Sequence, residues 1–91
     1  RLGLRRFRGG GTRPMSGLAA ALAAQGRLAE AVSVRRQLLR IRPGSGENWY
    51  RLAVESYLMG DRASAIQYCR RARDLGYEGV EAGFLERLER P

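Results

Sequence analysis

The sequence predicts an all-α fold of the α-solenoid class, built from helix-turn-helix repeats. Two observations support this prediction. The segment Gly-Arg-Leu-Ala-Glu-Ala at residues 26–31 returns 34 residues later, at 60–65, as Gly-Asp-Arg-Ala-Ser-Ala. The apolar and small residues around it return at the same spacing. A fixed period of this length is typical of stacked helix pairs, in which each pair buries its apolar face against its neighbours.

Two segments, 12–45 and 46–79, can be aligned over the whole period. Their matched apolar and small positions are Met15 with Trp49, Leu18 with Leu52, Ala19 with Ala53, Gly26 with Gly60, Ala31 with Ala65, Val32 with Ile66 and Ile41 with Leu75. This order resembles the tetratricopeptide repeat (TPR). Three positions depart from the family pattern: Ser56 stands in place of an aromatic residue, Arg35 in place of a large apolar residue and Tyr77 in place of a proline.

Residues 1–11 match the end of the first unit. Five of them are identical to the residues 34 positions later, namely Arg1, Leu4, Arg6, Arg8 and Gly10. We therefore expect a helix over 1–8 that is the second helix of a preceding repeat, and a chain that is the C-terminal part of a longer array. The alternative is an unstructured Arg/Gly tail, because the glycines of this segment are poor helix formers.

The next four helices are expected over 13–25, 28–41, 46–59 and 62–75. Gly26 and Gly60 should end helices in a left-handed conformation, which carries no steric penalty in glycine. Asp61 is the expected N-cap of the following helix. Pro43 closes the first unit because it lacks the backbone donor that a helix needs.

Residues 80–91 are predicted to be a C-terminal capping helix, with its helical part over 80–90. Phe84, Leu85 and Leu88 form one apolar stripe, and charged residues cover the remaining face. Terminal units of solenoids commonly have such a polar outer face. The alternative is an incomplete third repeat.

The first helix of the second unit has two apolar stripes. Trp49, Leu52, Ala53 and Ser56 should face the partner helix, with Trp49 packed on Ala65 and Cys69. The resemblance to the TPR family implies that the second stripe faces a concave groove in which ligands lie. The groove candidates are Tyr50, Val54, Tyr57 and Leu58, with Ser16, Ala20 and Ala23 as first-unit counterparts. An uncharged groove suits an apolar helix or extended segment, although part of the stripe could simply pack against neighbouring helices.

The positive charge is concentrated in the first half of the chain. All 17 basic residues are Arg, and residues 1–45 hold ten of them with one acid, Glu30. Arg35, Arg36, Arg40 and Arg42 are predicted to form a basic ridge that could bind phosphates or carboxylates. Aromatic residues do not interleave with this run, so a ridge facing solvent or a protein partner is favoured over a nucleic-acid site.

The sequence offers little for catalysis or cofactor binding. It has no His, no paired carboxylates and no phosphate-binding loop, and its single Cys69 is expected to be a buried structural thiol. We therefore expect no enzymatic activity, no cofactor and no metal site. No stretch is long and apolar enough to span a bilayer. The Arg5-Arg6-Phe7 segment is similar to an export signal, but Leu18 and Leu22 already fit the repeat, so a cytoplasmic location is favoured.

The resemblance and the surface together indicate a non-enzymatic protein–protein interaction or assembly scaffold. The expected partner is another protein, held in the groove as a helix or extended segment, with the basic ridge aiding docking. The alternative is an anion-binding module for RNA, DNA or an anionic membrane surface. In a further alternative, a subunit of a larger complex fills the groove.

Overall fold

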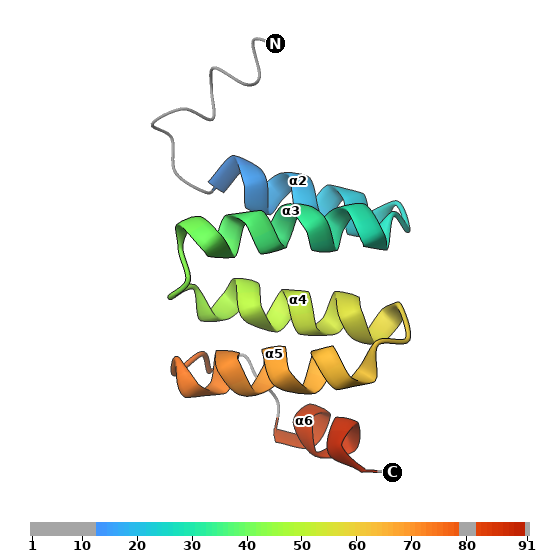
Figure 1. Ribbon diagram of the computed structural model, residues 1–91, viewed down its shortest axis with the longest axis vertical. Helices are drawn as coiled ribbons and strands as arrows, with labels where there is room; N and C mark the ends of the chain where they lie inside the picture. Colours follow the sequence, from blue (N-terminus) through green and yellow to red (C-terminus); the bar gives the residue numbers. More distant parts are fainter. Residues whose placement is uncertain (1–12, 79–81, 91) are drawn as a thin grey trace, which may run out of the picture.

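The computed structural model describes residues 13–78 and 82–90, which form a stack of helices (Figure 1). The first helix pair is α2 (Arg13–Ala24) and α3 (Leu28–Ile41), and the second is α4 (Gly46–Leu58) and α5 (Arg62–Asp74). The last helix, α6 (Ala82–Glu89), lies beside α5. These residues contain no strand, and the all-α helical-repeat solenoid is confirmed. The helix expected over 1–8 lies outside the described residues.

The same turn ends three helices. Gly26, Gly60 and Gly76 have φ values of +81°, +89° and +82°. After each glycine, the next amide donates to the carbonyl five residues back, as in Arg27 N to Leu22 O at 2.9 Å and Asp61 N to Ser56 O at 2.9 Å. This is the hydrogen bond of a Schellman motif. The left-handed glycines predicted at positions 26 and 60 are therefore confirmed.

Asp61 caps α5 as predicted. Its carboxylate accepts a hydrogen bond from the Ser64 amide at 3.2 Å, which satisfies a donor that the first helical turn leaves unpaired. Hydrogen bonding to Ser64 also lowers the pKa of the Asp61 carboxyl below its ordinary value. The cap therefore stays charged over the whole neutral range.

Two buried clusters form the core. The first, Leu38, Leu39 and Leu52, joins the two helix pairs. The second joins α4, α5 and α6, and its members are Ala53, Ala65, Cys69, Leu85 and Leu88. Leu85 and Leu88 are only 6% and 2% exposed, so the apolar stripe predicted for the last helix does face the core.

Trp49 packs differently from the prediction. It is half-buried and lies against the Leu38, Leu39 and Leu52 cluster, with its ring 5.7 Å from that of Tyr68, instead of packing on Ala65 and Cys69. The cluster that contains Ala65 and Cys69 is packed instead by Tyr50, Ile66, Tyr68 and Phe84. Trp49 therefore joins the repeats to each other more than it fills the second helix pair.

Gly46, the first residue of α4, allows a close approach of the loop after α5. A Cβ atom at this position would lie 2.8 Å from the Cβ atom of Tyr77, and this distance is too short for two carbon atoms. A Cβ at Gly44, two residues earlier, would meet open space. Tyr77 can therefore lie against the start of α4 only because residue 46 has no side chain.

We predict that Gly46→Ala lowers the free energy of unfolding by about 1 to 3 kcal/mol, since an inserted methyl group forces the packed chain apart. Thermal melting followed by circular dichroism measures this effect. Gly44→Ala is the matched control and should leave the melting temperature nearly unchanged. Equal melting temperatures for the two variants would contradict the close approach of Tyr77.

Cys69 should react slowly in the folded protein. Its side chain is fully buried, and burial raises the pKa of the thiol, because the thiolate would be poorly solvated. A neutral aromatic disulfide reagent should modify Cys69 at neutral pH only after denaturant unfolds the chain. Rapid modification of the native protein would show that the α4–α5–α6 cluster opens readily.

Candidate functional site

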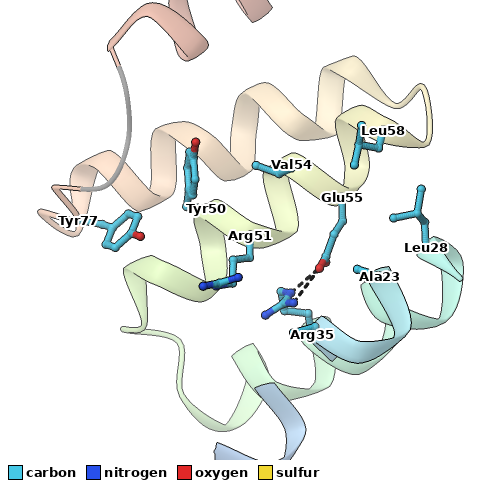
Figure 2. A pocket seen from close by; sticks show the side chains of 10 residues that line it. Ala23, Leu28, Arg35, Tyr50, Arg51, Val54, Glu55, Leu58 and Tyr77 are labelled. Atoms are coloured by element: carbon cyan, nitrogen blue, oxygen red, sulfur yellow. Dashed lines mark hydrogen bonds and ion pairs between the residues drawn. The ribbon is translucent and has the colours of Figure 1, made fainter. Parts of the chain in front are cut away.

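A groove of about 320 Å³ runs along one side of α4 (Figure 2). Val54 and Leu58 of α4 form one wall, Ala23 of α2 faces them, and Leu28 closes the end near the α2–α3 turn. Ala20 of α2 also lines the groove. Tyr50, Arg51 and Tyr77 lie toward the other end. Five of the predicted groove residues therefore line one cavity: Ala20, Ala23, Tyr50, Val54 and Leu58.

A buried ion pair lies at the floor of the groove. The Arg35 guanidinium donates from Nε to Glu55 Oε1 at 2.9 Å and from Nη2 to Glu55 Oε2 at 2.7 Å. The two side chains are 1% and 6% exposed. Such a two-pronged contact satisfies both carboxylate oxygens and fixes the orientation of the pair. Because Arg35 belongs to α3 and Glu55 to α4, the contact joins the two helix pairs.

The prediction that Arg35 belongs to a surface ridge is wrong. Arg35 lies one turn from Ala31 and from Leu38, which are both fully buried, so its side chain emerges on the core-facing side of α3. A lone guanidinium could not remain there, because an unpaired buried charge is strongly unfavourable. Glu55 provides the compensating charge.

Asn48 extends the ion pair into a polar network. Its side-chain oxygen accepts from Arg35 Nη1 at 2.8 Å and from the Ser16 hydroxyl at 3.3 Å, and its side-chain nitrogen donates to Ser45 Oγ at 2.8 Å. Ser16, predicted on the groove surface, therefore links α2 to this network. Among the described residues, no buried side-chain polar atom lacks a hydrogen-bond partner. A fully satisfied network of this kind holds its members in one arrangement.

The aromatic end of the groove continues toward α6. The Tyr50 ring lies 5.6 Å from that of Tyr77 and 5.9 Å from that of Phe84. Tyr57, the remaining groove candidate, is half-exposed, and the centre of its ring lies 5.9 Å from that of Phe84 with the two rings nearly perpendicular. It lines a separate cavity of about 160 Å³ together with Arg62 and Arg87. The structure thus places Tyr57 beside the groove cavity, not in its lining.

The charges in the groove lining are balanced internally. Arg51 pairs with Glu47 at 3.0 Å, one helical turn away, and Arg35 pairs with Glu55. The other side chains of the lining are apolar or tyrosine. The groove therefore offers an apolar surface with no free ionic group among the residues that line it.

The remaining ridge residues, Arg36, Arg40 and Arg42, are exposed. Arg36 and Arg40 line two further cavities, of about 240 and 520 Å³, on a different face of α3 from Arg35. Trp49 and Tyr68 belong to the smaller of these cavities.

Sequence reasoning missed Leu28 and Tyr77 in the groove lining and Glu55 at its floor. Leu28 begins α3 and Tyr77 follows α5, so neither belongs to the apolar stripe of α4, and helical periodicity could not place them. The signal for Glu55 was present, because a charged residue at a core-facing position of α3 requires a buried partner of opposite charge.

The tetratricopeptide repeat family model matches residues 16–55, most of α2 through most of α4. This match confirms the resemblance found in the sequence. Tetratricopeptide repeats generally mediate protein–protein interaction or assembly and are typically not enzymes. No curated protein matches the chain.

Within 13–78 and 82–90, no three His, Cys, Asp or Glu side chains gather as a metal ion would require. No helix in the same part of the chain has the length and apolar character needed to cross a membrane.

We predict that Glu55→Ala lowers the free energy of unfolding by about 3 to 5 kcal/mol, because it leaves the Arg35 charge buried without a partner. Glu47→Ala removes an exposed pair and should cost less than about 1 kcal/mol. Chemical denaturation measures both. The double variant Arg35→Leu with Glu55→Leu should recover most of the loss, since an apolar pair needs no compensating charge. Equal losses for Glu55→Ala and Glu47→Ala would contradict a buried pair.

Proposed function

We propose that this protein is a docking module that holds an uncharged, largely apolar segment of a partner protein in the groove of α2 and α4. One observation supports this most directly: the groove lining is apolar and aromatic, and its two arginines already have carboxylate partners. A charged ligand would find no unpaired ionic group there, whereas an apolar side chain would gain buried area.

The dimensions favour a short segment with a few anchoring side chains. A cavity of about 320 Å³ accommodates one or two large apolar side chains, not a whole helix. Tyr50 and Tyr77 offer aromatic faces at one end, and Leu28 and Leu58 offer aliphatic contacts at the other. The partner segment would therefore lie along α4, with an aliphatic anchor near Leu58 and a ring or proline near the tyrosines.

In this proposal, the polar network at the floor of the groove allows an apolar surface to discriminate between ligands. The Arg35–Glu55 pair fixes the separation of α3 from α4, and Ser16 fixes α2 through Asn48. A groove held at one width loses little conformational entropy when a ligand binds. The same variants that disturb the floor should therefore change the affinity of the groove.

The test uses random peptides of about twelve residues, which are long enough to cross the groove. They are selected on the intact protein, and the affinity of each selected peptide is measured by fluorescence anisotropy. Apolar peptides should bind, and Leu58→Glu should weaken them at least about tenfold, because a carboxylate would have to be desolvated beside the ligand. Binding should change little between about 50 and 200 mM salt, since no phosphate or carboxylate is neutralised.

Ile41→Glu is the matched control. Ile41 and Leu58 are each the last residue of their helix and each 61% exposed, but only Leu58 lines the groove. The control variant should bind as the unchanged protein does. Selection of no apolar peptide, equal losses in the two variants, or a steep fall with salt would contradict groove docking.

A further inference from the structure

A second, chemically different surface lies on the far side of α4 from the groove. Two cavities, of about 240 and 520 Å³, adjoin there because Arg36 and Arg40 line both. Trp49 and Leu52 of α4 belong to the smaller cavity, and Met59, the residue after α4, belongs to the larger one. Trp49 and Leu52 fall on the helix face opposite Val54 and Leu58. On α3 the combined surface extends from Ala29 to Arg40, or about 16 Å at the rise of an α-helix.

The surface combines apolar contacts with positive charge. Val32 and Met59 line the larger cavity, and Leu39, Trp49 and Tyr68 line the smaller one. Arg36 and Arg40 lie one helical turn apart on α3 and line both cavities. The linings of the two cavities contain no acidic residue.

The lack of ion-pair partners for these two arginines among the described residues distinguishes the surface from the groove. Arg35 and Arg51, in the groove, are each paired with a glutamate. Arg36 and Arg40 have no ion-pair or hydrogen-bond partner within residues 13–78 and 82–90. Two neighbouring guanidinium groups also repel each other. A ligand with carboxylates would therefore gain both pairing and relief of this repulsion.

We infer that this surface, defined by Arg36, Arg40, Trp49, Tyr68 and Met59, is a second docking site that binds an acidic amphipathic helix of another protein. Two carboxylates one turn apart on that helix match the spacing of Arg36 and Arg40. Apolar side chains of the same helix reach Trp49 in the smaller cavity and Met59 in the larger one. The 16 Å surface accommodates about three turns of such a helix.

The aromatic residues argue against a nucleic acid as the ligand. Single strands bind by stacking bases on open aromatic faces. The Trp49 ring already has the Arg71 guanidinium 5.5 Å from its centre and the Tyr68 ring at 5.7 Å, and its indole N–H donates to the Pro43 carbonyl at 2.7 Å. Trp49 thus offers an edge for apolar contact more than a free platform for a base.

The experiment selects random peptides of about twelve residues on the intact protein and repeats the selection on Arg36→Gln/Arg40→Gln. A class of peptides with two acidic residues three or four positions apart, flanked by apolar residues, should appear on the unchanged protein and disappear on the double variant. Affinities measured by fluorescence anisotropy should fall about tenfold in the double variant, as expected for the loss of two exposed ion pairs.

Arg27→Gln/Arg70→Gln is the matched control, because it removes the same net charge from arginines that have glutamate partners and line neither the groove nor this surface. The acidic peptides should bind this variant as they bind the unchanged protein, and they should also bind Leu58→Glu, whose change lies in the groove. Circular dichroism should show that a bound peptide becomes helical.

Three outcomes would overturn the inference: no acidic class in the selection, equal losses in the two double variants, or loss on Leu58→Glu. A single-stranded oligouridine that displaces the acidic peptides, binds more tightly than they do and depends on Arg36 and Arg40 would also overturn it, and would assign the surface to nucleic acid.

Discussion

The buried contact between Arg35 and Glu55 is the constraint on which the rest of the structure depends. It crosses from the first helix pair to the second, with two hydrogen bonds of 2.9 and 2.7 Å, and Asn48 connects it to α2 through Ser16. Replacing such a pair by apolar residues often costs no stability. Its value lies in geometry, because a guanidinium and a carboxylate satisfy each other in few orientations. The pair therefore sets the register of the two helix pairs more than it strengthens their association.

That register gives α4 two faces of different chemistry. On one face, Val54 and Leu58 meet α2 across a groove whose charges are balanced, and on the other, Trp49 and Leu52 lie beneath arginines that have no partner among the described residues. The division follows from helical periodicity, since neighbouring positions point about 100° apart. A change in the rotation of α4 about its axis would mix the two surfaces. The buried ion pair opposes this rotation because Glu55 lies between the groove residues and the core.

The repeat period predicted the fold well because it reports local turns and the spacing of small residues. Gly26, Gly60 and Asp61 behave as the sequence indicated, since each acts through its own backbone or nearest neighbours. Arg35 and Trp49 were placed incorrectly because their positions depend on partners about 20 residues away, Glu55 and Tyr68. The family pattern assigns a large apolar residue at position 35, and an arginine there indicates a partner without identifying it. Tyr77 can lie in the groove lining only because Gly46 has no side chain.

A charged pair beneath an apolar groove is consistent with apolar ligands, because the two charges neutralise each other and have no unsatisfied polar atom. In the proposed complex, the ligand meets the hydrocarbon parts of the wall, and the charges act only by keeping that wall in place. On the opposite face of α4, an arginine is exposed to solvent and needs no buried partner. Arg36 lies next in sequence to Arg35, but helical rotation carries it away from Glu55 and leaves its charge available to a partner. A single step along α3 thus separates the internal charge of Arg35, which shapes the groove, from the external charge of Arg36, which can select an acidic ligand.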